Sequence, residues 1–150
     1  MELMSDTPAM ETAEGVSSVR LCIPAKPEYV ALGRLALTGL AQSRGLSSDT
    51  IADLKLALTE AVSNSVRHAY GTQGEGHVEI GYELHADSVV IEVVDDGAGF
   101  DPGEAPSFDG DELSEGGLGI AIIRAIADEI EIESRPGARG SRLRFVKKLS

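Results

Sequence analysis

The sequence predicts an α+β fold, a two-layer α/β sandwich with helices on one face of a mixed, mostly antiparallel sheet. Strand-like segments follow one another in runs, and the helical stretches stand apart from them, which is typical of this class. The chain has 150 residues, 42% of them hydrophobic and 25% charged. We therefore expect one domain over residues 16–150, after a polar leader over residues 1–15 that is expected to be disordered.

The domain begins with an apolar segment. A strand is expected over residues 16–23, closed by Pro24 and Pro27. A helix is expected from Pro27 to about Arg44, ended by Gly45. Its apolar residues cover more than one narrow stripe, so part of this helix is expected to face a partner. These residues are Val30, Leu32, Leu35, Leu37 and Leu40.

A second helix is expected to begin at Ser48 or Asp49, either of which is a good cap. Residues 71–76 are expected to form a flexible connection. Two strands follow over residues 77–85 and Ser88–Asp95, and their short link indicates an antiparallel pair. The expected buried face of the helix recurs at helical spacing and consists of Ile51, Leu54, Leu58, Ala61, Val62 and Ser65.

A polar segment rich in Gly and Asp runs from residue 96 to residue 115. It is longer than most loops, and such segments are commonly functional lids or disordered. An apolar helix over residues 118–128 should pack flat on a sheet. Strands over Glu129–Ser134 and residues 141–149 complete the prediction.

Composition excludes several classes of function. The formal net charge of −12 argues against nucleic-acid binding, which needs a basic surface. The chain has no signal-peptide pattern and no apolar stretch of about 20 residues, so it is expected to be cytoplasmic without a membrane partner. The lone Cys22 is expected to be a small buried hydrophobe. Basic residues from Arg135 to Lys148 are interpreted as a solvated strand face rather than a binding patch.

The first candidate motif lies on the second helix. Glu60, Asn64 and His68 are one turn apart and form a polar stripe beside the apolar face. The stripe offers a base, a neutral oxygen ligand and a phosphate partner. The Asn oxygen suits Mg²⁺, which takes one or two protein ligands and leaves the rest to phosphate and water. Taken alone, the stripe also fits an ordinary solvated helix face.

The second motif follows the apolar strand that ends at Asp95. A carboxylate at this position is costly unless it is hydrogen-bonded. Accepting a hydrogen bond from the exocyclic amine of adenine would satisfy it and would reject guanine. Gly97 and Gly99 let the backbone approach a flat base. An Asp-Gly turn that simply ends a strand is the alternative.

The third motif is Gly116-Gly117-Leu118-Gly119, at the start of the last helix. Glycines there present backbone N–H groups to an anion, helped by the helix dipole. A flexible loop exit is the alternative. The chain has no P-loop, no dinucleotide-binding glycine fingerprint and no zinc or nucleophile-elbow motif.

Taken together, these residues resemble the GHKL superfamily of ATPases and its Bergerat ATP-binding fold. Ser141 follows Gly140 where the superfamily often has Gly-Thr before its last strand. The matching residues are Glu60, Asn64 and His68 for the N box, Asp95, Gly97 and Gly99 for the first glycine box, and Gly117, Leu118 and Gly119 for the second.

Within the superfamily, residues 59–70 and 115–120 look most like the anti-sigma factor serine kinases of bacterial partner switching. The resemblance implies ATP and Mg²⁺ as cofactors and serine/threonine-protein kinase activity. It also implies roles for single residues: Glu60 as general base, Asn64 as Mg²⁺ ligand, His68 on phosphate, Asp95 on adenine, Gly97, Gly99, Gly117 and Gly119 in shaping the lid, and Ser141 supporting Asp95 through a water.

The expected lid departs from the family pattern. Relatives often place a basic residue there to meet the γ-phosphate, but residues 100–115 contain no Lys or Arg and many acidic side chains. The charge would then be met by Mg²⁺, His68, Arg67, Arg124 or a partner's basic residue.

Two function hypotheses from different classes follow. The first is an anti-sigma factor, expected as a homodimer, that binds a sigma factor and phosphorylates a small STAS-type antagonist with ATP. The second is a non-catalytic ATP-sensing module that sequesters a regulator without phosphotransfer, and the acidic lid favours it. A detached histidine-kinase catalytic domain ranks last, because nothing before residue 16 could supply its helical hairpin.

Overall fold

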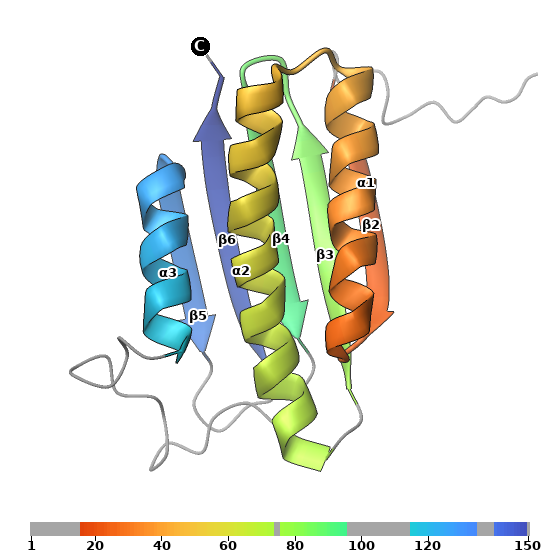
Figure 1. Ribbon diagram of the computed structural model, residues 1–150, viewed down its shortest axis with the longest axis vertical. Helices are drawn as coiled ribbons and strands as arrows, with labels where there is room; N and C mark the ends of the chain where they lie inside the picture. Colours follow the sequence, from red (N-terminus) through yellow and green to blue (C-terminus); the bar gives the residue numbers. More distant parts are fainter. Residues whose placement is uncertain (1–15, 74–75, 96–114, 135–139, 150) are drawn as a thin grey trace, which may run out of the picture.

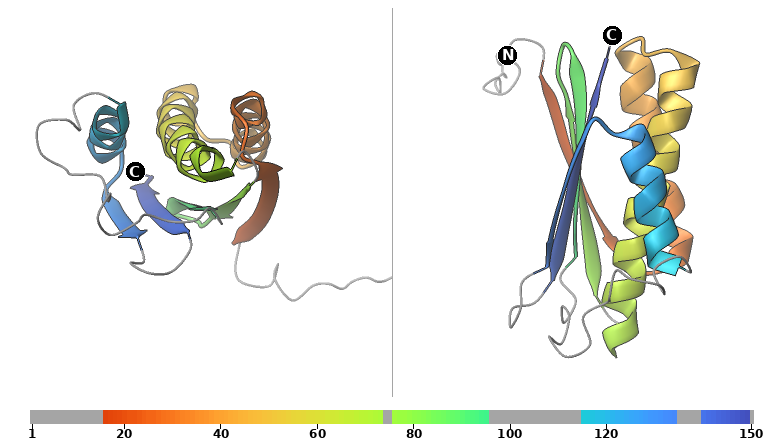
Figure 2. Two further views of the ribbon diagram at one scale, coloured as in Figure 1. Left: turned by 90° about the horizontal axis from the view of Figure 1, so that it is seen from below. Right: turned by 90° about the vertical axis from the view of Figure 1, so that its left-hand side faces the viewer.

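In a computed structural model, the described part of the chain forms two layers, a sheet and a set of helices that cover one of its faces (Figure 1, Figure 2). The structure describes residues 16–73, 76–95, 115–134 and 140–149. The expected leader and most of the expected lid, residues 1–15 and 96–114, lie outside the described residues. The predicted α+β class is confirmed by this architecture.

The strands are β2 (Ser17–Pro24), β3 (His77–Leu84), β4 (Ser88–Asp95), β5 (Glu129–Ser134) and β6 (Ser141–Lys148). They pair in the order β2-β3-β4-β6-β5, and every neighbouring pair is antiparallel. The sheet predicted as mixed is therefore wholly antiparallel in the part of the chain that the structure describes.

The helices are α1 (Val30–Ser43), α2 (Ser48–Gln73) and α3 (Glu115–Ile126), and a short 3-10 turn, η1 (Pro27–Tyr29), leads into α1. On the covered face of the sheet, α2 lies between α1 and α3 (Figure 1). The Ser47 hydroxyl accepts a 3.1 Å hydrogen bond from the Thr50 N–H. Ser47, rather than the expected Ser48 or Asp49, therefore caps α2.

Two helix boundaries differ from the prediction at glycines. The α2 helix continues through Gly71 to Gln73, where a flexible connection was expected from residue 71. The α3 helix begins at Glu115, so Gly116 and Gly117 lie within its first turn. A glycine in a helix costs only about 1 kcal/mol relative to alanine. Packing of the rest of each helix outweighs that local cost.

The covered face of the sheet and the helices enclose one apolar core. Strand side chains at alternate positions point toward the helices, and Ile80, Tyr82, Ile91 and Phe145 are fully buried among them. The buried face predicted for α2 is confirmed, because all six of its residues from Ile51 to Ser65 are buried.

Gly33 lets α1 approach β3 closely. A Cβ at position 33 would lie 3.0 Å from the Ile80 Cδ1, so a side chain there would press on that methyl group. The Tyr82 hydroxyl donates a 2.9 Å hydrogen bond to the Gly33 carbonyl oxygen. Burial raises the pKa of Tyr82, because a phenolate there would lose its solvation. The hydroxyl therefore stays a donor at physiological pH.

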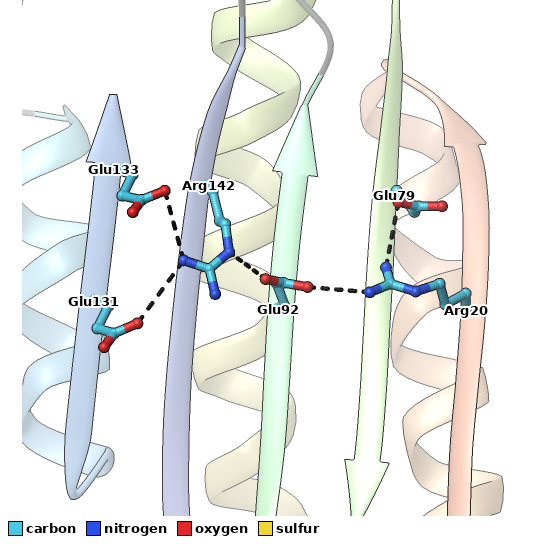
Figure 3. A network of polar contacts seen from close by, with 6 residues as sticks. All are labelled: Arg20, Glu79, Glu92, Glu131, Glu133 and Arg142. Atoms are coloured by element: carbon cyan, nitrogen blue, oxygen red, sulfur yellow. Dashed lines mark hydrogen bonds and ion pairs between the residues drawn. The ribbon is translucent and has the colours of Figure 1, made fainter. Parts of the chain in front are cut away.

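The open face of the sheet carries charged side chains (Figure 3), whereas the face toward the helices is apolar. Arg20 of β2 contacts Glu79 of β3 at 3.3 Å and Glu92 of β4 at 3.2 Å. Gly81 lies between Arg20 and Glu92 in the strand register, and a Cβ there would lie 3.3 Å from the Arg20 guanidinium. The missing side chain lets Arg20 cross β3. Cys22, expected to be buried, is exposed, because it lies on the same open face as Arg20.

Arg142 of β6 extends this network to the other edge of the sheet (Figure 3). It pairs with Glu92 and reaches Glu133 and Glu131 of β5 at 3.6 and 3.8 Å. For Arg142, the interpretation of the basic residues as a strand face is thus confirmed. The Glu92 side chain is 20% exposed and is shared by two arginines.

The charge of Glu92 is stabilised in the folded protein. Burial favours the neutral carboxyl, but hydrogen bonds from Arg142 and Arg20 outweigh that effect and lower the pKa of Glu92. A carboxylate with a lowered folded-state pKa stabilises the fold above its unfolded-state pKa of about 4.3. This stabilisation is lost as the pH falls through the folded-state pKa.

Glu92→Gln removes the charge that the two arginines share. At pH 7 we expect the free energy of unfolding to fall by about 1–3 kcal/mol. The difference from the wild type should shrink as the pH falls below about 4, where the wild-type carboxylate is itself being protonated. Urea unfolding at both pH values measures this.

Glu131→Gln is the matched control on the same face. Its side chain is 63% exposed and its contact with Arg142 is 3.8 Å, so the loss of free energy of unfolding should be about 0.5 kcal/mol. Equal losses for the two variants at pH 7 would contradict the central place of Glu92.

Candidate functional site

The predicted site residues that the structure describes come from elements that meet at one end of the molecule. Figure 1 shows the second half of α2, the end of β4 and the start of α3 at the lower end of the view. Glu60 and Asn64 lie on α2, Asp95 ends β4, and Gly119 lies on α3. Segments far apart in the sequence are thus brought to one region.

Glu60 lies against the first turns of α3. A Cβ built on Gly119 would lie 2.8 Å from the Glu60 Oε1. The carboxylate therefore occupies space that any larger side chain at position 119 would take. Glu60 is half-buried and Gly119 is buried, whereas the neighbouring Leu118 is exposed. The structure thus brings together the first and third motifs.

Asn64 is one helical turn beyond Glu60, on the same side of α2. Its amide oxygen accepts a 3.2 Å hydrogen bond from the Arg67 guanidinium. This oxygen is therefore already directed at a cation. From the sequence, Arg67 is expected only as a phosphate partner. Its position three residues after Asn64 on a helix is the signal that indicates the hydrogen bond between them.

Asp95 is a buried carboxylate, 3% exposed, at the end of β4. Strand pairing places it opposite Ser141 of β6, and the Ser141 hydroxyl donates a 2.6 Å hydrogen bond to the Asp95 Oδ2. Ser141 thus contacts Asp95 directly, where a contact through a water was expected, because the strand register places the two residues opposite each other. Asp95 shares its strand face with the core residues Ile91 and Val93, so its carboxylate is on the helix side of the sheet.

The remaining predicted site residues are described in part or not at all. Gly97 and Gly99 lie outside the described residues. His68 lies on α2 one turn beyond Asn64, and its side chain is also outside them. Gly117 lies in the first turn of α3. The roles expected for these residues stay predictions.

A surface hollow of about 410 Å³ lies at the other end of the molecule, where α2 begins and β6 ends. Its lining mixes acidic residues, Asp49 and Asp53, with the basic Lys147 and Lys148, and includes none of the predicted site residues. Within the described ranges, no three His, Cys, Asp or Glu side chains gather to hold a metal ion. No described helix is long and apolar enough to cross a membrane.

The arrangement is suited to a nucleotide bound with a cation. Asp95 is an acceptor for an amine at one point of the site, and the start of α3 offers backbone N–H groups and the positive end of the helix dipole to phosphates. A single amide oxygen from Asn64 suits Mg²⁺, whose other ligands come from phosphate and water. Glu60 adds a carboxylate able to accept a proton.

Comparisons with known proteins agree with this chemistry. Residues 23–147 match the family model of the histidine kinase-like ATPase domain. The chain is 38% identical over 130 residues to the serine-protein kinase RsbW of Bacillus velezensis, covering 81% of this chain and 81% of that protein. It is 38% identical over 122 residues to RsbW of Listeria monocytogenes, covering 76% of this chain and 78% of that protein.

Solved structures share the fold. A structure of the RsbU and RsbW domains of a Mycobacterium tuberculosis protein aligns with a TM-score of 0.66 at 22% identity, over 89% of this chain and 32% of that longer chain. A chain of the SiaB–SiaC complex from Pseudomonas aeruginosa aligns with a TM-score of 0.60 at 17% identity, over 97% of this chain and 99% of that one. At these identities the likeness concerns the fold alone.

Asp95→Ala removes the buried acceptor at the end of β4. We expect the affinity for ATP to fall at least about tenfold, because a hydrogen bond to a charged group contributes about 1.5–3 kcal/mol. Titration calorimetry with ATP measures this, and thermal unfolding checks that the variant is folded.

Ser141→Ala is the graded companion, since it removes only the hydroxyl that orients Asp95. We expect a smaller loss, about three- to tenfold. Wild-type ATP affinity in a folded Asp95→Ala protein would show that the adenine assignment is wrong.

Proposed function

Because this chain belongs to the histidine kinase-like ATPase family, we propose that it is an ATP-dependent serine-protein kinase and anti-sigma factor of a bacterial partner-switching system. Its acceptor is a serine of a small STAS-type antagonist, and it sequesters a sigma factor when that antagonist is phosphorylated. Both partners act in transcription control, so we place the protein in the cytoplasm. The resemblance to the GHKL superfamily and its serine-kinase branch is confirmed by the family match and the RsbW relatives.

The position of Glu60 is the observation that carries the catalytic part of the proposal. Its carboxylate lies between α2 and α3, one turn before Asn64. A general base must come within hydrogen-bond reach of the hydroxyl that it deprotonates, close to the phosphates held by the metal. Because Glu60 and Asn64 lie one turn apart on the same helix, the distance between the base and the metal ligand is fixed.

Arg67 supplies a cation that the expected lid lacks. Residues 100–115 contain no Lys or Arg, and Arg67 donates to the Asn64 oxygen that would ligate Mg²⁺. Two cations repel each other at one oxygen, so Arg67 would exchange Asn64 for a phosphate oxygen of the bound nucleotide. The bound ion itself would screen the phosphate charge during transfer.

Asp95 gives the site its preference for adenine. An ionised carboxylate only accepts hydrogen bonds, so it pairs with the amine of adenine and is repelled by the oxo group of guanine. The Ser141 hydroxyl holds the carboxylate in place from the neighbouring strand. This supports ATP rather than GTP as the phosphate donor.

A non-catalytic ATP-sensing module is the second candidate. The acidic composition of residues 100–115 favours it, because many negative charges near the γ-phosphate would oppose transfer. Such a module would bind ATP and hold its regulator without modifying it.

Incubation of the chain with Mg-ATP and a purified STAS-type antagonist separates the two candidates. The kinase is supported by a mass increase of one phosphate on the antagonist, mapped to a serine. An antagonist that forms a complex with the ATP-bound chain yet gains no phosphate would favour the sensing module.

Glu60→Ala is expected to lower the rate of phosphate transfer by about 100-fold or more, which is the usual contribution of a general base. ATP affinity should change less than about twofold, because Glu60 is assigned to the acceptor hydroxyl rather than to the nucleotide. Transfer is followed by phosphoserine content and affinity by calorimetry. Glu28→Ala, an exposed change on η1, is the control. Undiminished transfer by Glu60→Ala would remove Glu60 from catalysis.

Exposed leucines on α1 support the proposal of a homodimer. Leu32 and Leu35 are 45% and 67% exposed and lie on one side of the helix. Leu35→Glu is expected to shift the protein toward monomer, as measured by size-exclusion chromatography with light scattering. Leu56→Glu, which changes an exposed leucine of α2, should leave the dimer intact. A dimer that survives Leu35→Glu would exclude this face.

A further inference from the structure

The Glu60 side chain lies beside Gly119 on α3. The α2 and α3 helices pack side by side. A Cβ built on Gly119 would lie 2.8 Å from the Glu60 Oε1, 3.7 Å from its Cβ and 3.8 Å from its Cδ. Glu60 can occupy this position only because residue 119 has no side chain.

Packing is what limits the position of this carboxylate. Among the described residues, no hydrogen bond or ion pair holds Glu60. Asp95 differs, because Ser141 orients it through a hydrogen bond. A general base needs a defined position, since a displacement of about 1 Å can cost about 100-fold in rate. The wall formed by the α3 backbone is the restraint that the structure offers.

We propose that Gly119 is a positioning residue for Glu60. By lacking a side chain, it leaves room for the Glu60 carboxylate beside the α3 backbone, which then holds the carboxylate one turn from Asn64. This role is additional to the presentation of backbone N–H groups to phosphate, because it acts through the side chain of Glu60. Its catalytic meaning rests on the proposed kinase function, whereas the contact itself does not.

Gly119→Ala tests this role with little risk to the fold. The atom in the way is the end of a flexible side chain, so the carboxylate moves and the helices need not. Alanine keeps the backbone N–H at position 119 and favours a helix by about 1 kcal/mol over glycine. The variant should therefore fold and bind nucleotide.

We expect Gly119→Ala to lower kcat for transfer from Mg-ATP to the STAS-type antagonist by about tenfold or more, with KM for ATP within about twofold. Gly39→Ala is the matched control, because Gly39 is also helical and has nothing within 4 Å of an added Cβ. It should leave both constants unchanged. Wild-type kcat in a folded Gly119→Ala protein would overturn the proposal.

A Glu60→Asp background shows whether the effect passes through Glu60. The shorter side chain withdraws the carboxylate from position 119, so adding Gly119→Ala there should lower kcat by less than about twofold. An equal loss in both backgrounds would overturn the proposal, since the methyl group would then act elsewhere.

The contact can also be followed without any kinase assay. The carboxyl carbon resonance of Glu60, assigned by its loss in Glu60→Gln, should shift in Gly119→Ala and not in Gly39→Ala. An unmoved resonance would overturn the inference whatever the activity. If the resonance shifts in Gly119→Ala but the wild-type protein transfers no phosphate, the contact is supported and the kinase function is rejected.

Discussion

The burial of one face of α2 is the constraint on which the rest of the structure depends. This helix lies between α1 and α3 over the middle of the sheet (Figure 1). Leu54, Leu58 and Ala61 are fully buried, and exposing one such leucine costs about 1.5–3 kcal/mol. The rotation of α2 about its own axis is therefore fixed. Once it is fixed, Glu60 is turned toward α3, so the burial that stabilises the domain also directs the Glu60 side chain.

Much of the fold follows from local pattern, and the exceptions have physical causes. The helical spacing of apolar residues predicts the buried face of α2, and the short link before Ser88 predicts the β3–β4 pair. The end of α2 at Gln73 is not predicted, because a single glycine costs a helix only about 1 kcal/mol and does not end it at Gly71. The exposure of Cys22 is also missed, since apolar neighbours do not reveal which face of a strand is covered.

The candidate site divides in the same way. Helical spacing places Glu60 and Asn64 on one stripe, and the position at the end of an apolar run makes Asp95 a candidate. The contact of Glu60 with Gly119 and the direct bond from Ser141 to Asp95 depend on helix packing and strand register. No local sequence pattern reveals contacts between residues that are so far apart along the chain. The network on the open face is of this kind too, because it depends on strand pairing and on the missing side chain of Gly81.

The place of β6 in the sheet has a consequence for how the chain acquires its site during synthesis. Although β6 follows β5 in sequence, it is inserted between β4 and β5. A chain leaving the ribosome therefore has an unpaired β4 edge, and Asp95 has no Ser141 beside it, until that strand arrives. The pairing that orients the Asp95 carboxylate therefore forms only after β6 has been made. Proteolytic loss of that single strand would remove Ser141 and leave the Asp95 carboxylate without the hydroxyl that orients it.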